Sequence, residues 1–104
     1  MQKVIAGYPV EVTEEGYLTK KEQWNKEIAR AIAKEVGIAE LTEAHWRVIE
    51  FLQKDYAKTE KIPTIRRLKN TGGIDTKELY ALFPEGPLMK ATKIAGLMKP
   101  VSCV

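Results

Sequence analysis

The sequence is poor in the residues that build catalytic centres and cross-links. Its 104 residues include one cysteine, Cys103, and one histidine, His45. A single cysteine cannot form an internal disulfide, which excludes the cross-linked scaffolds of many small secreted proteins. One cysteine and one histidine are too few for a zinc site of the usual kind. Gly-rich phosphate loops, Ser-nucleophile elbows and His-Glu-x-x-His motifs are also missing. We therefore expect no metal, no cofactor and no stand-alone catalytic site.

Long apolar runs are missing as well. No stretch approaches the roughly 20 apolar residues that span a bilayer, and residues 1–7 lack the apolar core of a signal peptide. Hydrophobic residues make up 44% of the chain and charged residues 30%, as in ordinary globular domains. This composition and length predict one cytoplasmic domain that does not insert into membranes.

Acidic residues are scarce in the C-terminal part of the chain. Residues 1–60 contain 9 Lys and Arg against 11 Asp and Glu, whereas residues 61–104 contain 8 against 3. Such a basic region suggests an anionic partner, although a solvated surface has the same composition. A docking surface for an acidic protein and a nucleic-acid contact both remain open. The candidate docking residues are Lys61, Arg66, Arg67, Lys69, Lys93 and Lys99.

Short β-forming segments come first in the chain and helical segments follow. Residues 4–5, 8–12 and 17–18 are typical of a small antiparallel meander. Apolar residues at helical spacing, together with cap residues, then predict about five helices. These cover residues 19–36, 43–58, 65–70, 77–83 and 87–95.

Local signals predict where these helices begin and end. The expected starts are a Thr19–Glu22 capping box, Thr42, Pro63 as a cap or first helical residue, and Thr76. Gly37 and Gly96 are the expected ends. The aromatic and apolar core candidates are Trp24, Trp46, Phe51, Tyr80, Leu82 and Phe83, and His45 receives no role.

These patterns predict an α+β domain. A small N-terminal antiparallel β-meander packs on an array of about five helices over residues 1–96, and residues 97–104 form a flexible C-terminal arm. Gly96 is the expected hinge of this arm and Pro100 stiffens it. Extended, the eight residues of the arm would span roughly 26 to 29 Å.

Cys103 is the candidate reactive residue. Its position next to the end of the chain leaves little bulk around the sulfur. Lys99 favours the thiolate form, whereas the terminal carboxylate of Val104 opposes it. A thiol at the end of an arm, without a dedicated base, suits exchange at sulfur, in which it accepts a persulfide sulfur and releases it to another thiolate. An incidental surface cysteine is the alternative interpretation.

Five segments carry a resemblance to a known family. They are Gly16-Tyr17-Leu18 with Trp24, Leu41 to Trp46, Pro63 to Leu68, Leu82 to Pro87, and Lys93 to Pro100 followed by Cys103-Val104. In this order they resemble the DsrC/TusE sulfur-carrier proteins, a family that includes the gamma subunit of dissimilatory sulfite reductase. The resemblance covers nearly the whole chain.

The resemblance implies a function and a set of partners. It implies a β-meander with a helical array, an arm whose penultimate cysteine bears the sulfur, and no bound metal or cofactor; Cys103 occupies that position. DsrC-type members deliver the cysteine to the siroheme site of sulfite reductase, and TusE-type members relay persulfide sulfur toward tRNA thiolation. The resemblance therefore implies a sulfurtransferase-type carrier or, alternatively, a non-catalytic gamma-type subunit of the reductase. A helix-turn-helix-like DNA-binding regulator is a third hypothesis, which rests on the basic residues around 58–69.

One departure from the family pattern bears on which sulfur-transfer mechanism is expected. Two-cysteine members carry a second cysteine eleven positions before the last one, where this chain has Thr92. Cys103 therefore cannot form an intramolecular disulfide or trisulfide. The departure favours a single-thiol relay like that of TusE.

Overall fold

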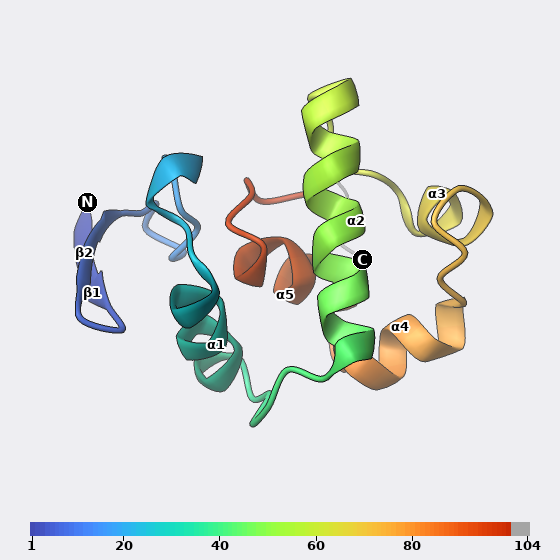
Figure 1. The fold of residues 1–104 in the computed structure, drawn as a ribbon, viewed down its shortest axis with the longest axis horizontal. Helices are drawn as coiled ribbons and strands as arrows, with labels where there is room; N and C mark the ends of the chain where they lie inside the picture. Colours follow the sequence, from blue (N-terminus) through green and yellow to red (C-terminus); the bar gives the residue numbers. More distant parts are fainter. Residues whose placement is uncertain (101–104) are drawn as a thin grey trace.

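Two short strands and five α-helices make up residues 1–100, which are the part of the chain that the computed structural model describes. The elements are β1 Gln2–Ile5, β2 Tyr8–Glu11, a 3-10 turn at Lys21–Gln23, α1 Lys26–Glu35, α2 Glu43–Thr59, α3 Ile65–Asn70, α4 Thr76–Leu82 and α5 Pro87–Ile94. Figure 1 shows the hairpin at one end of the molecule, α3 and α4 at the other, and α5 between α1 and α2. The predicted α+β class with five helices is confirmed.

The N-terminal strands form a tight antiparallel hairpin. Ala6 and Gly7 both have positive φ angles, 53° and 85°, as a two-residue turn between twisted strands requires. The third expected segment contributes a single bridge between Val12 and Leu18. Val10, Val12 and Leu18 are buried, so the hairpin attaches to the helices through this side.

The first helix begins later than its sequence pattern indicates. Asn25 is the N-cap, and its side chain accepts a hydrogen bond from the backbone N–H of Ile28 at 2.9 Å. The predicted Thr19–Glu22 capping box is therefore wrong. Residues 21–23 form a 3-10 turn, and Trp24 has an extended backbone with ψ 141°. From this extended residue the Trp24 side chain reaches α5, where its indole N–H donates to the carbonyl of Ile94.

The other helix ends lie at or next to the predicted residues. Gly37 ends α1 with φ 92°, and the N–H of Ile38 donates to the carbonyl of Ala33 at 2.8 Å, which closes a Schellman motif. Thr42 caps α2 as expected. Thr64 rather than Pro63 caps α3, and Asp75 rather than Thr76 caps α4, so these two starts are wrong by one residue.

The hydrophobic core surrounds α5. Leu88, Ala91 and Ile94 of this helix are almost completely buried, and Phe83 just before it has no exposed surface. Four other core candidates are half-buried at its edge: Trp24, Trp46, Phe51 and Leu82. Tyr80 is 45% exposed, so its assignment to the core is wrong; α4 packs through Leu79 instead, one residue earlier on the helix.

A helix that crosses a membrane must be both long and apolar. Within residues 1–100, no helix is both long enough and apolar enough to cross a bilayer.

Candidate functional site

The predicted reactive residue, Cys103, lies outside the described residues. The structure does describe the segment that leads to it. We call residues 95–100 the arm base; they follow α5 and join the helical domain to Cys103. The arm base therefore determines where the last residues of the chain begin.

The arm base starts at a closed helix end. Gly96 has φ 74°, the N–H of Gly96 donates to the carbonyl of Lys93 at 3.2 Å, and the N–H of Leu97 donates to the carbonyl of Thr92 at 3.0 Å. This is the Schellman motif that also ends α1. Leu97 is only 8% exposed and belongs to the core. The part of the predicted arm that begins at residue 97 is thus packed on the domain at its first residue.

Two distant side chains hold this helix end. The indole Nε1–H of Trp24 donates to the carbonyl of Ile94 at 2.8 Å, and the amide Nε2 of Gln53 donates to the carbonyl of Ala95 at 2.9 Å. Both carbonyls belong to the last turn, where a helix cannot supply its own donors. Trp24 precedes α1 and Gln53 lies on α2, so the arm base is tied to both neighbouring elements.

Gly96 is also packed tightly against Trp24. A Cβ atom at residue 96 would lie 2.5 Å from Cδ1 of the indole, which is far inside van der Waals contact. Glycine is required here both by the positive φ and by the approach of the ring. Its role as a hinge remains a prediction, as does that of Pro100.

Contacts beyond Leu97 are weaker. The hydroxyl of Tyr56 donates to Sδ of Met98 at 3.4 Å, and Nζ of Lys99 lies 2.8 Å from Oε2 of Glu15. Both partners of the ion pair are about half exposed, so it contributes little to stability. The arm base therefore has core packing and backbone hydrogen bonds up to Leu97, side-chain contacts on exposed residues at Met98 and Lys99, and a buried residue again at Pro100.

Two hollows flank the arm base, and we call them together the arm-base groove. One has a volume of about 230 Å³ and the other about 270 Å³, and they share Lys21, Tyr56, Gly96 and Leu97. The first is also lined by Trp24, Gln53, Ala57 and Ala95, and the second by Thr13, Tyr17, Leu18, Thr19, Met98 and Lys99. The lining is largely apolar and aromatic, with two lysines and no acidic residue.

Thr92 is the residue at the position where the resemblance places the second cysteine of two-cysteine members. Its side chain has no exposed surface, and its hydroxyl donates to the carbonyl of Leu88 at 2.8 Å. The carbonyl of Thr92 accepts the N–H of Leu97. A side chain at residue 92 therefore lies beneath the arm base, without contact with solvent.

Tyr17 lies beside this buried position. Its hydroxyl donates to the carbonyl of Met89 at 3.2 Å, and Nζ of Lys93 lies 5.6 Å from the ring centroid. Burial raises the pKa of the Tyr17 phenol, and the charge of Glu15 adds to the increase, while Lys99 and a hydrogen bond with Thr92 oppose it. The phenol is accordingly held in its neutral, proton-donating form.

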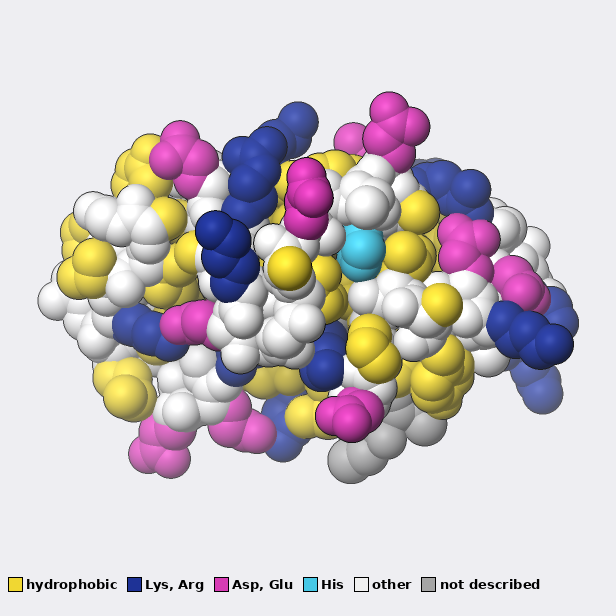
Figure 2. Space-filling view, turned by 90° about the horizontal axis from the view of Figure 1, so that it is seen from below, with side chains coloured by type: hydrophobic (Ala, Val, Ile, Leu, Met, Phe, Trp, Pro, Cys, Tyr) yellow, Lys and Arg dark blue, Asp and Glu magenta, His cyan; other side chains and the backbone are white. Residues whose placement is uncertain are grey.

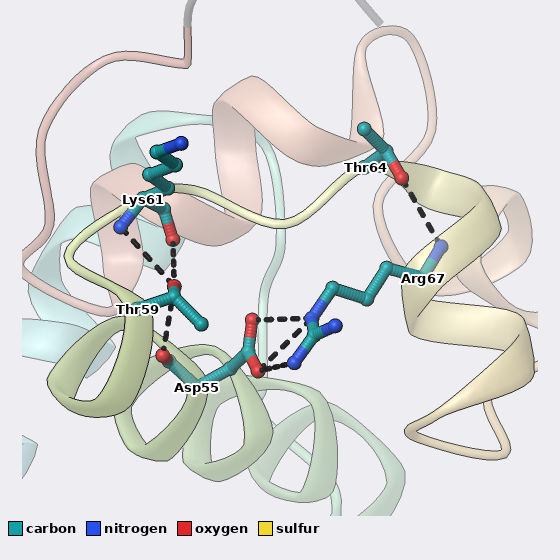
Figure 3. Close-up of polar contacts among 5 residues, drawn as sticks. All are labelled: Asp55, Thr59, Lys61, Thr64 and Arg67. Atoms are coloured by element: carbon teal, nitrogen blue, oxygen red, sulfur yellow. Dashed lines mark hydrogen bonds and ion pairs between the residues drawn. The ribbon is translucent and has the colours of Figure 1, made fainter.

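One predicted docking residue has a structural role. The Arg67 guanidinium binds both oxygens of Asp55, with Nη2 2.7 Å from Oδ1 and Nε 3.0 Å from Oδ2 (Figure 3). The Asp55 side chain is 4% exposed. These hydrogen bonds and the carboxylate charge raise the pKa of Arg67, so its charge is fixed. A buried carboxylate needs such a partner, and this need explains the position of Arg67.

The structure divides the other docking candidates among several elements. Lys61, Arg66 and Lys69 are exposed on the α2–α3 connection and on α3, Lys93 is on α5, and Lys99 is in the arm base. On the face shown in Figure 2, basic side chains alternate with acidic ones. The positive net charge is therefore not concentrated on that face, and the docking role of these residues remains a prediction.

His45, which received no role from the sequence, organises the contact between α2 and α4. Its Nδ1 accepts the backbone N–H of Thr42 at 3.0 Å, so the neutral ring carries its proton on Nε2, which donates to the carbonyl of Leu82 at 3.0 Å. The ring also contacts Phe83 edge-on at 5.2 Å. The capping-box spacing Thr42-x-x-His45 was the signal available. Residues 1–100 contain no cluster of three or more His, Cys, Asp or Glu that could hold a metal ion.

Comparison with known proteins agrees with this fold. The family model "DsrC like protein" matches residues 4–104. The chain is 45% identical to the sulfurtransferase TusE homolog of Haemophilus influenzae, over 96% of this chain and 97% of the relative. It superposes on a chain of dissimilatory sulfite reductase I (DsrI) with a TM-score of 0.88 and 37% identity, and on the NMR structure of Allochromatium vinosum DsrC with a TM-score of 0.85 and 38% identity. Both alignments cover 100% of each chain. With sequence and fold in agreement, the chain belongs to the DsrC-like protein family.

Proposed function

We propose that this protein is a sulfur carrier that accepts a sulfur atom on Cys103 and passes it to the thiol of a partner. The observation that carries the proposal is the relation to the TusE sulfurtransferases over 96–97% of this chain, together with the family model that matches residues 4–104. Cys103 is the only thiol in the chain. Any sulfur that the protein carries as a persulfide must therefore be on this residue.

The chemistry is two successive exchanges at sulfur. The Cys103 thiolate attacks the outer sulfur of a donor persulfide, R–S–SH, so that Cys103–S–SH forms and the donor leaves as R–S⁻. An acceptor thiolate then attacks the outer sulfur of Cys103–S–SH, which transfers that atom and regenerates the Cys103 thiolate. Each step breaks one S–S bond and forms another, so no external oxidant or reductant is needed. Access to the sulfur decides the rate more than an elaborate catalytic site.

Thr92 supports a single-thiol relay rather than a two-cysteine mechanism. A threonine cannot form a disulfide with Cys103, so the second thiol must belong to another molecule. We propose that the protein works in the cytoplasm as a TusE-type relay, whose sulfur goes toward tRNA thiolation. Its partners would then be the proteins that precede and follow it in that relay.

Mass spectrometry of the intact protein tests the carrier function. After incubation with inorganic polysulfide and removal of the excess, the wild-type chain should gain about 32 Da, the mass of one sulfur, and lose it again with dithiothreitol. Cys103→Ser should gain nothing. An equal gain in Cys103→Ser, or no gain in the wild type, contradicts the proposal.

The similarity to a chain of dissimilatory sulfite reductase I favours a second candidate function, that of a non-catalytic gamma-type subunit. Docking would then use the exposed cations Lys61, Arg66 and Lys69, and co-purification with reductase subunits should be lost in Arg66→Glu/Lys69→Glu. Arg67 is unsuitable for this test because its loss would leave Asp55 buried without a counterion. Unchanged co-purification would exclude this face. DNA binding, the third hypothesis, predicts a gel shift that weakens steeply with salt.

A further inference from the structure

The length of chain beyond the arm base limits where Cys103 can act. Cys103 follows Pro100 by three positions in the sequence. At about 3.6 Å per residue, Cα of Cys103 stays within about 11 Å of Cα of Pro100, whereas detachment from Gly96 onward would extend the reach to about 25 Å. While the arm base keeps its contacts, a partner thiol that meets Cys103 must come close to the arm base. As long as the arm base stays attached, the surface around this segment is therefore part of the complex in which sulfur is exchanged.

That surface has the features of a protein-binding site. The arm-base groove is walled by Trp24, Tyr56 and Tyr17, and Met98, which is 49% exposed, lies along it. Aromatic side chains in a partly formed pocket contribute most of the binding energy in many interfaces. The hydrogen bonds of Trp24 and Gln53 to the last turn of α5 hold one wall in place before a partner arrives. Such preorganisation lowers the entropic cost of binding.

The charges of the groove indicate the chemistry of its partner. Lys21 lines both hollows, and neither lining contains an Asp or Glu; Lys99 lines one of them but is paired with Glu15. Carboxylates of a partner placed at the rim would be attracted to Lys21, and an apolar side chain between them would fill the aromatic groove.

We propose that the arm-base groove is the docking surface for the protein that exchanges sulfur with Cys103, and that this partner presents an apolar side chain flanked by carboxylates. The proposal rests on the carrier function of Cys103 and adds the surface and the partner's chemistry. It places the contact at a groove centred on Lys21, Tyr56 and Leu97, and of the docking residues predicted from the sequence only Lys99 lines this groove.

Two short thiol peptides serve as probes. One is N-acetyl-Glu-Leu-Cys-Leu-Glu-amide and the other is the same peptide with Lys in place of Glu. The full-length protein is loaded with sulfur from polysulfide, and the initial rate of transfer to each peptide is measured at low salt by mass spectrometry. We expect the acidic peptide to accept sulfur about three- to tenfold faster than the basic one. Cyanide, which removes the outer sulfur as thiocyanate without docking, gives the intrinsic reactivity of Cys103.

Matched variants locate the effect. Lys21→Glu should abolish or invert the preference for the acidic peptide, whereas Lys20→Glu, at the adjacent exposed lysine that lines neither hollow, should leave it unchanged. Tyr56→Ala should slow transfer to both peptides, and Tyr80→Ala, at an exposed tyrosine on α4, should not. The cyanide rate should be the same in all variants.

The outcomes separate this proposal from the carrier function. If Cys103 takes no sulfur from polysulfide, the carrier function fails. If Cys103 takes sulfur and releases it to cyanide, but neither Lys21→Glu nor Tyr56→Ala changes peptide transfer, only the docking surface is refuted. NMR spectroscopy of the full-length protein provides a further test. The acidic peptide should shift the Trp24 indole signal, and an equal shift on alkylation of Cys103 with a bulky maleimide would assign the groove to the protein's own tail instead.

Discussion

Replacement of Gly96 by alanine measures how tightly the arm base is held. Two costs are expected. A non-glycine residue in the left-handed region costs about 1–2 kcal/mol, and the new Cβ, 2.5 Å from Cδ1 of Trp24, must displace the ring or the backbone at a further cost of about 1–3 kcal/mol. The variant should therefore lose about 2–5 kcal/mol of unfolding free energy. This is a large part of the 5–15 kcal/mol typical of a domain.

Gly37 provides the matched control. It occupies the same position in the Schellman motif at the end of α1, with φ 92°, but a Cβ there meets no atom within 4 Å. Gly37→Ala should therefore carry only the backbone cost of about 1–2 kcal/mol. The difference between the two variants isolates the packing of Trp24 against the arm base.

Urea denaturation followed by circular dichroism supplies both free energies, and equal m values would show that the denatured states are comparable. A combined Gly96→Ala/Trp24→Leu variant should be more stable than the sum of its single effects predicts, because the smaller side chain makes room for the Cβ. Gly96→Ala within about 0.5 kcal/mol of Gly37→Ala, with additive double-variant behaviour, would refute the reasoning.

Three further results are expected. In an absorbance titration, Tyr17 should lose its proton above the ordinary pKa of 10.0. Because the pKa is raised in the folded state, the contribution of Tyr17 to the unfolding free energy is fully present below pH 10 and is lost as the pH rises through the folded pKa. Tyr17→Phe should remove this loss of stability at high pH. In a Thr92→Cys/Cys103→Ser variant, the buried thiol should react with Ellman's reagent only after unfolding in urea, and rapid reaction of the native protein would show that residue 92 is accessible. His45→Ala should lower the unfolding free energy by about 1–3 kcal/mol because the carbonyl of Leu82 loses its donor, and a smaller loss in denaturant titrations would indicate that water replaces the ring.

The local elements of the fold could be predicted from the sequence where a short segment decides the conformation. Gly37 and Gly96 end helices because only glycine enters the left-handed region without strain, and Thr42 caps α2 through its own side chain. The start of α1 is harder to predict because Thr19 and Asn25 are both good caps, and the structure uses Asn25. The choice between them depends on Trp24, whose partner is 70 residues away.

The candidate site was predictable only in part, for the same reason. Cys103 stands out as the single cysteine at the end of the chain, whereas the bond from Gln53 to Ala95 joins residues 42 positions apart. The sequence alone predicts a docking role for Arg67, whereas the structure pairs it with the buried Asp55. The spacing of Leu52 and Asp55 on one face of α2 was a usable signal, because an acidic residue on a buried face requires a cation from another element.

The long-range bond between Trp24 and Ile94 has a consequence for the order of folding. Contacts between residues far apart in sequence carry the largest loop-closure entropy and tend to form late. The hairpin, α1 and α2 precede the acceptor in the chain, and both helices pack on α5, whose residue Ile94 supplies the acceptor carbonyl for Trp24. A nascent or truncated chain that lacks α5 leaves the indole N–H without this acceptor. The core that α1 and α2 share with α5 can thus close only once α5 is present, and the arm base forms together with it.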